Sequence, residues 1–284
     1  MTRVKLIVSL LILIGLSTSA ATSFAKPAPK PKCGFNGDYS FFFWDPGLPI
    51  AGVGFFSVAL DPSTNCRSGV VLPGGILNCN FDTGEFEDFI ENGSVFLESD
   101  GEGTMLLETN SSRGICGTGD DAVELDISVV KGGKSVLFNS NGVQHAGSGL
   151  IPQAGYNVTL TGRADKCFAG DISGCYDVRF WEATADRVGD CTICVGGGFV
   201  LSGTCRCNNS GFETLSEIET GGYTLGEDCQ SSTGFLFFDT SSDEVCDLTS
   251  TVYLDFAVAQ QGSELIGACD SFNRFDCAFE GWLQ

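Results

Sequence analysis

The sequence predicts an all-β protein of two tandem antiparallel barrels, about eight strands each, braced by disulfides and without a long helix after a signal peptide. Three observations lead to this fold class. Short runs alternate apolar and polar residues, which is the period of a strand with one buried face. The chain of 284 residues contains 38 Gly and 23 Phe. The phrase GDYSFFFWD at 37–45 returns as GCYDVRFWE at 174–182, with its Gly, Tyr, Phe and Trp at the same spacing.

The N-terminus predicts export. Arg3 and Lys5 precede an apolar run at 6–16, and small residues end the segment at Ala25, as in a secretory signal peptide. The run is shorter than the roughly 20 residues of a membrane-spanning helix. We therefore expect a signal peptide at 1–25, a linker containing KPAPKPK at 26–36, and a secreted protein, periplasmic or extracellular.

The first barrel repeat is expected at 37–166. VELDISVV alternates so that its Val, Leu and Ile residues share one face, and KGGK then supplies the turn of a hairpin whose second strand begins at SVLF. Further strands are predicted at YSFFF, GFFSVAL, GSVFLES, TMLLET and YNVTLTG.

The second barrel repeat is expected at 167–284, with a cysteine-rich N-terminal part. VYLDFAVAQQGSELIG at 252–267 aligns without a gap to VELDISVVKGGKSVLF at 123–138. Other segments of the two copies are similar and occur in the same order. The similar pairs are 103–109 with 233–240, 93–99 with 221–227, and more weakly 159–165 with 277–284. Matching order, spacing and alternation indicate a tandem duplication.

Each copy has enough short strands to close on itself. Eight strands form a barrel whose interior is filled by side chains or holds one small ligand, and closure removes exposed edges. One larger two-sheet structure shared by both copies is the alternative.

The order of the phrases GDYSFFF, AGVGFFSVALD, ENGSVFLESDGEGTMLLET, LDISVVKGGKSVLF and TLTGRADK resembles small exported bacterial β-barrel proteins, a largely uncharacterised group. In overall style these barrels are similar to those of lipocalins and allene oxide cyclases. The first copy matches through most of its length, and the second keeps the later half. The shared motifs are strands and turns, so the resemblance implies a fold and transfers no catalytic residue.

Alternation divides the aromatic residues of the duplicated phrase between two faces. The core or ligand-pocket candidates on one face are Tyr39, Phe41 and Phe43 in the first copy and Tyr176 and Phe180 in the second. Trp44 and Trp181 fall on the opposite face at the strand ends. Each tryptophan could cover a barrel mouth, lie between the two copies or contact a ligand.

The 14 cysteines of an exported chain predict disulfides. Local pairs are expected for Cys269 with Cys277, and for Cys66 with Cys79, which flank a Gly-Pro turn region. CTIC and CRC supply the other disulfide candidates, with zinc binding or thiol exchange as the alternative; these are Cys191, Cys194, Cys205 and Cys207.

The net charge and the lack of a catalytic motif reduce the number of function classes that fit the sequence. The net charge of −21 disfavours nucleic acid and anionic lipid as partners. No catalytic residue is identified, and no cofactor or metal is expected. The sequence favours a non-enzymatic exported binding or surface protein, whose partner is a small apolar ligand or another surface component. The alternatives are a barrel-pocket enzyme of the cyclase or isomerase type, acting on a small apolar substrate, and a structural component of an extracellular assembly. The sequence leaves the oligomeric state open.

Overall fold

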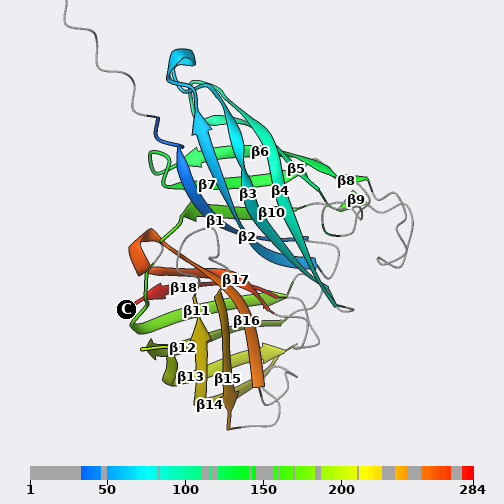
Figure 1. Cartoon of the computed structure of the whole chain (residues 1–284). Coiled ribbons are helices and arrows are strands. Elements are labelled where there is room, and N and C mark those ends of the chain that lie inside the picture. The colour runs from blue at the N-terminus through cyan, green and yellow to red at the C-terminus, as the bar shows by residue number, and fades with distance from the viewer. Residues whose placement is uncertain are drawn as a thin grey trace, which may run out of the picture. The chain divides into compact units, whose positions relative to one another are not determined.

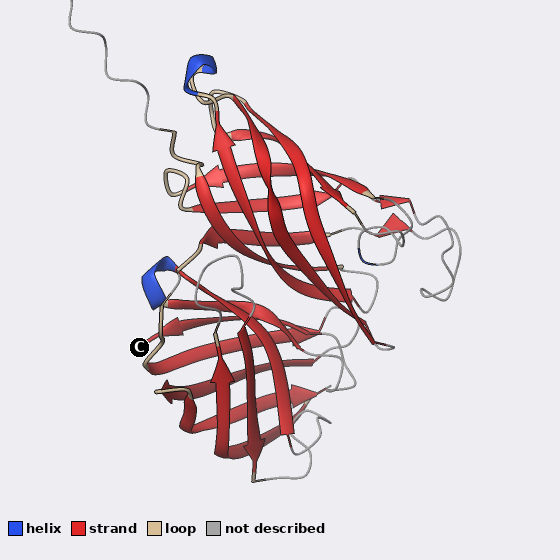
Figure 2. Ribbon diagram, viewed as in Figure 1, coloured by secondary structure: helices blue, strands red, loops and turns tan. Residues whose placement is uncertain are grey.

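The chain forms two closed antiparallel barrels of eight strands each (Figures 1 and 2). The computed structural model describes residues 33–45, 50–81, 84–110, 116, 121–140, 143–144, 157–158, 160–168, 170–182, 187–209, 211–225, 234–241, 251–269 and 277–284. No α-helix occurs within these ranges. The predicted signal peptide and most of the predicted linker lie outside the described residues.

The first barrel is an up-and-down meander closed by its last strand against its first, in the order β1-β10-β7-β6-β5-β4-β3-β2. Its strands are β1 (Gly37–Trp44), β2 (Ile50–Leu60), β3 (Ser68–Phe81), β4 (Gly84–Leu97), β5 (Glu102–Thr109), β6 (Ala122–Val130), β7 (Ser135–Ser140) and β10 (Thr161–Lys166). A separate pair, β8 (Val143–Gln144) and β9 (Asn157–Val158), lies in the connection from β7 to β10.

The second barrel repeats this plan, with consecutive strands paired from β11 to β18 and β18 closing on β11. Its strands are β11 (Gly174–Glu182), β12 (Arg187–Gly196), β13 (Phe199–Asn209), β14 (Phe212–Thr224), β15 (Gly234–Thr240), β16 (Thr251–Ala259), β17 (Glu264–Cys269) and β18 (Cys277–Leu283). Two closed barrels confirm the tandem architecture, and the alternative of one shared two-sheet structure is wrong.

Each repeated residue of the duplicated phrase has the same structural role in both copies. Gly37 and Gly174 begin β1 and β11 with φ of 104° and 121°, a region that favours glycine. The Tyr39 hydroxyl donates to the Gly133 carbonyl at 2.5 Å, and the Tyr176 hydroxyl donates to the Gly262 carbonyl at 2.5 Å. The two acceptors lie at equivalent positions in the β6–β7 and β16–β17 turns. The first strand of each barrel is thus tied to the same hairpin turn.

The phenylalanine of the phrase packs over a glycine on the neighbouring strand. Phe43 is paired with Gly52, and Phe180 with Gly189. A Cβ atom at Gly52 would lie 2.2 Å from Cζ of Phe43, and one at Gly189 would lie 2.1 Å from Cζ of Phe180. The ring and the missing side chain therefore form one packing unit, present in both barrels.

The core of each barrel is its interior. Tyr39, Phe41 and Phe43 are buried in the first core, and Tyr176 is buried in the second, where Phe180 packs against the cluster from a partly buried position. These five candidates lie inside the barrels.

Candidate functional site

The outer face of β1 and β2 packs against the outer face of β16, β17 and β18, so the two barrels share an interface. All six residues of β17 are buried, and so are ten of the eleven in β2. One side of each strand faces the core of its own barrel, and the other side faces the other barrel. Five residues form the apolar centre of this interface: Phe42, Val53, Ala257, Ile266 and Ala278.

The two tryptophans of the duplicated phrase meet at this interface. Their ring centroids are 5.3 Å apart in an edge-to-face arrangement with an interplanar angle of 86°. The Phe42 ring stacks on Trp44 at 5.7 Å and meets Trp181 edge-on at 6.0 Å. Of the three roles that the sequence allows for Trp44 and Trp181, the structure shows packing between the two copies.

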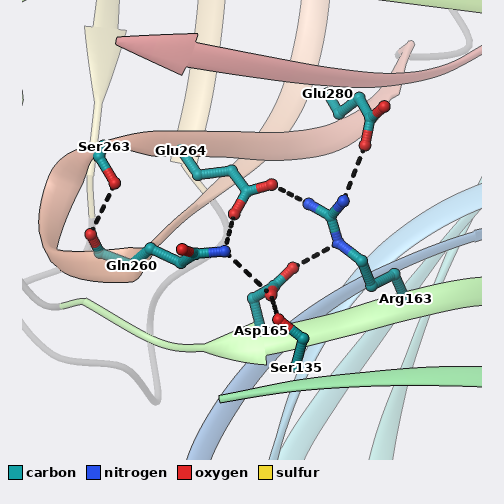
Figure 3. Close-up of polar contacts among 7 residues, drawn as sticks. All are labelled: Ser135, Arg163, Asp165, Gln260, Ser263, Glu264 and Glu280. Carbon is teal, nitrogen blue, oxygen red and sulfur yellow. Dashed lines mark hydrogen bonds and ion pairs between the residues drawn. The ribbon is translucent and has the colours of Figure 1, made fainter. Parts of the chain in front are cut away.

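A polar cluster continues the interface beside Phe42, whose ring centroid lies 5.7 Å from Cζ of Arg163. Figure 3 shows the polar contacts of this cluster. Arg163 of β10 donates through Nε to Asp165 at 2.5 Å and through Nη1 to Glu280 of β18 at 2.9 Å, and its Nη2 donates to Glu264 of β17. Gln260 donates through Nε2 to Glu264 at 2.5 Å and more weakly to Asp165 at 3.4 Å. One guanidinium and one amide thus bind carboxylates from both barrels.

This cluster has more acid than base. Burial and the neighbouring Asp165 raise the pKa of Glu264, although Arg163 and Lys131 act in the opposite direction. The pKa of Arg163 is raised because attraction from Asp165, Glu264 and Glu280 outweighs burial, which lowers it. Arg163 is therefore a permanent cation that holds the surrounding carboxylates together.

A second polar contact crosses the interface further along β16. Asn80 of β3 donates through Nδ2 to Asp255 at 2.9 Å and to the Cys269 carbonyl at 2.9 Å. Both side chains are buried, and Asn80 belongs to the first barrel whereas Asp255 belongs to the second. The interface therefore combines an apolar centre with buried polar contacts on more than one side.

Within the part of the chain that the structure describes, both barrel interiors are packed with apolar side chains. The second interior contains a cavity with about 20 Å³ of space for the centre of a water-sized sphere, lined by apolar residues that include Val178, Phe180 and Phe279. That volume corresponds to about one water molecule. In the first interior the aromatic rings contact one another in a row. The ring centroid of Phe41 lies 5.4 Å from that of Phe56 and 6.1 Å from that of Phe138 of β7.

Two grooves lie on the outer faces instead. The first barrel has an open groove of about 480 Å³ across β4, β5, β6 and β7, where Phe96 and Leu137 lie beside Glu98, Glu102 and Asp126. The second barrel has a groove of about 290 Å³ lined by a ladder of alternating charges. In this ladder Arg179 pairs in register with Asp190, Asp190 pairs with Arg206, and Arg206 forms a salt bridge of 3.1 Å with Glu213.

The disulfides differ between the copies. In the first barrel Cys33 is bonded to Cys66, and Cys79 to Cys116. The expected Cys66–Cys79 pair is wrong because β3 continues through the Gly-Pro region as one strand of 14 residues, which places the two cysteines near opposite ends of an extended segment.

In the second barrel the disulfides join neighbouring strands. Cys175 is bonded to Cys194 and Cys191 to Cys205, each to the residue directly opposite in the sheet. The pair expected between Cys269 and Cys277 is formed, and Cys207 is also disulfide-bonded. The thiols of CTIC are therefore in disulfides and unavailable as zinc ligands. Among the described residues, no group of three His, Cys, Asp or Glu side chains is placed to hold a metal.

Sequence reasoning missed the residues that join the barrels, namely Phe42, Val53, Arg163, Asp165, Glu264 and Asn80. One signal was available: IAGVGFFSVAL is apolar almost without alternation, which is typical of a strand buried on both faces. The polar contacts have no such signal, because Arg163 and Glu264 are separated by 101 positions.

Comparisons with known proteins leave the family open. No protein-family model matches the sequence, and no curated protein matches it. Transferrin binding protein B of serogroup B Neisseria meningitidis is similar at 6% identity and a TM-score of 0.25, over 82% of this chain and 66% of that one, just under two thirds. The intact transferrin binding protein called Ap-TbpB aligns at 7% identity and a TM-score of 0.26, over 88% of this chain and 76% of that one.

The Myxococcus xanthus hemagglutinin, solved with a mannopentaose, aligns at 11% identity and a TM-score of 0.17, over 87% of this chain and all of that one. Likeness this remote supports no conclusion about function. The resemblance to exported bacterial barrels stays a prediction. No helix within the described ranges is long and apolar enough to cross a membrane.

Proposed function

We propose that the chain is an exported, non-enzymatic binding or surface protein, in which two fused barrels present their outer faces and loops to a partner. The observation that carries this proposal is the filling of the barrel interiors by the protein's own aromatic and aliphatic side chains. Recognition is therefore assigned to the outside of the molecule, where the open grooves lie.

The barrel-pocket enzyme is the weaker candidate for a physical reason. Pockets for small molecules usually enclose about 300–1,000 Å³. The cavity of the second barrel offers about 20 Å³, so a substrate would have to displace core side chains such as Phe180 and Phe279. Displacing packed aromatic side chains costs several kcal/mol (about 3–5 for a deleted one).

The disulfides and the joined barrels support the extracytoplasmic part of the proposal. Disulfides persist in oxidising compartments and are rare in the cytosol. The described cysteines include none in the free form. A structure braced in this way suits a protein that remains folded outside the cell without chaperones.

Two measurements test this proposal. N-terminal sequencing of protein recovered from the exported fraction should give a chain that begins at Lys26, following cleavage after Ala25. Native mass spectrometry of the same material, compared with the denatured unreduced chain, should show no additional mass. A retained cytosolic chain would contradict export, and a small molecule released on denaturation would favour an interior pocket.

A further inference from the structure

An aromatic face covers part of the outside of the second barrel; we define it as Phe199, Phe235, Phe237 and Tyr253. Phe199 pairs with Gly222, Gly222 with Phe237, and Phe237 with Tyr253, so these residues form one row across β13, β14, β15 and β16. Phe235 lies on β15 two positions from Phe237, on the same face.

The barrel fold does not require this face. The equivalent row of the first barrel is Val70, Ser94, Leu106 and Glu124, paired in the same way across β3, β4, β5 and β6. Thr104 occupies the position of Phe235. The first barrel closes with small, aliphatic and charged residues at these outward positions, so the aromatic rings of the second need an explanation other than folding.

Three of the four rings, those of Phe235, Phe237 and Tyr253, pack against one another. The ring centroids of Phe235 and Tyr253 are 5.5 Å apart, and those of Phe237 and Tyr253 are 6.4 Å apart, each pair with an interplanar angle of 30°. Gly222 leaves room for the ring of Phe237 to pack over it, since a Cβ at Gly222 would lie 3.2 Å from Cε1 of Phe237. Phe199 is 63% exposed and Phe237 is 38% exposed. Phe235 and Tyr253 are half-buried. Exposed apolar side chains gathered on one face are a feature of interaction sites.

Hydroxyl and carboxylate groups border the aromatic face. On one side Thr220 pairs with Asp239, and Asp239 pairs with Thr251. The Thr251 hydroxyl donates to the Asp239 carboxylate at 2.5 Å. On the other side Thr224 pairs with Phe235. None of the residues in these rows is cationic. Phe235 pairs in turn with Asp255, which is buried and accepts a hydrogen bond from Asn80. The accessible border thus offers threonine hydroxyls and the carboxylate of Asp239 as hydrogen-bond partners.

We propose that the aromatic face binds a neutral saccharide; this inference rests on the proposed function and assigns its partner. One face of a pyranose ring presents weakly positive C–H groups, which stack on the negative face of an aromatic ring. Its equatorial hydroxyls point outward, toward the threonines and Asp239. A second copy of the chain is a poorer occupant, because each copy has a net charge of −21 and the two would repel one another.

Native affinity electrophoresis tests this assignment on the full mature chain. Gels containing xyloglucan, galactomannan or mixed-linkage β-glucan serve as probes, and at least one should retard the protein. Replacing three residues of the face by their first-barrel counterparts, F199V, F237L and Y253E together, should weaken that retardation at least tenfold. The first barrel already closes with these residues, so the variant should retain its circular dichroism spectrum.

The matched control is L215E. Leu215 is an exposed apolar residue of β14 outside the aromatic face, and this substitution also adds one carboxylate. L215E should be retarded like the native chain. The assignment is overturned if no polysaccharide retards the native protein, if the triple variant is retarded equally, or if sedimentation shows a dimer that the triple variant dissociates.

These outcomes are separable from failure of the proposed function. A dimer formed through the aromatic face would overturn saccharide binding and leave an exported surface protein in place. A ligand inside the second barrel would overturn the proposed function, and its binding would not respond to the triple substitution.

Discussion

The outer faces of β6–β7 and β16–β17 have the same register and opposite surroundings. In the second barrel Ala257 and Ile266 belong to the apolar centre of the interface, and Ala268, on the same face of β17 as Ile266, is fully buried. In the first barrel their counterparts are Ser128, Leu137 and Asn139, which line an open groove, and Leu137 is 48% exposed. Inward-facing residues keep their roles in both copies, because either barrel needs a filled interior to close.

Outward-facing residues have diverged with their surroundings. Alanine on β16, β17 and β18 allows the strands of the second barrel to approach the first closely, whereas the equivalent positions of the first barrel are polar or exposed. The same divergence places aromatic rings at Phe199, Phe237 and Tyr253, where the first barrel has Val70, Leu106 and Glu124. Residues shared by the two copies are therefore those that the barrel fold requires, and outward residues that differ between the copies reflect what each outer surface contacts.

The largest effect is expected when the charge at the interface is removed. In R163M, Asp165 and Glu264 keep their burial and lose their cation, which should destabilise the joined barrels by about 3–5 kcal/mol. Urea unfolding followed by tryptophan fluorescence measures this, since Trp44 and Trp181 report on the interface. R206M is the control: its salt bridge with Glu213 is exposed, so the loss should be at most about 1 kcal/mol. Equal losses would contradict the assigned role of Arg163.

A swap between the copies tests the comparison directly. A268N introduces the first-barrel residue at a position that is fully buried, and should cost about 2–3 kcal/mol through overpacking and burial of an unpaired amide. The reverse change, N139A, lies on the exposed groove and should stay within about 0.5 kcal/mol. Chemical denaturation of both variants measures the difference. If A268N were as stable as the native chain, the two barrels would not be tightly packed there.

Removing the hydroxyl hydrogen bond of Tyr39 or of Tyr176 should have a smaller effect on stability, and a similar effect in each barrel. Y39F leaves the Gly133 carbonyl without its donor and should destabilise the first barrel by about 1–2 kcal/mol. Y176F should act in the same direction on the second barrel through Gly262, and somewhat less strongly because that bond is only partly buried. Amide hydrogen exchange in the two hairpin turns distinguishes the barrels. Unchanged exchange in both variants would show that these hydroxyls do not hold the turns.

The sequence predicted the parts of the fold that depend on local pattern. Alternation in VELDISVV and the KGGK turn specify a hairpin, and the repeat of GDYSFFFWD specifies a second barrel with the same register. The contact between the barrels was beyond such reasoning, because nothing near Arg163 in the chain indicates that Glu264 will face it. Trp44 and Trp181 show the limit: their outward direction followed from alternation, but their meeting depends on how two closed barrels pack.

The smallest expected effect is a dependence of the interface on pH. The pKa of Glu264 is raised by burial and by Asp165, against the attraction of Arg163 and Lys131, with Glu280 also bound to Arg163. Above the usual carboxyl range the folded state therefore holds a proton that the unfolded state has released, and stability falls as pH rises through the raised pKa. Urea midpoints measured from pH 4.5 to 8 should show this decline, and E264Q should flatten it. A decline that persists in E264Q would place the titrating group elsewhere.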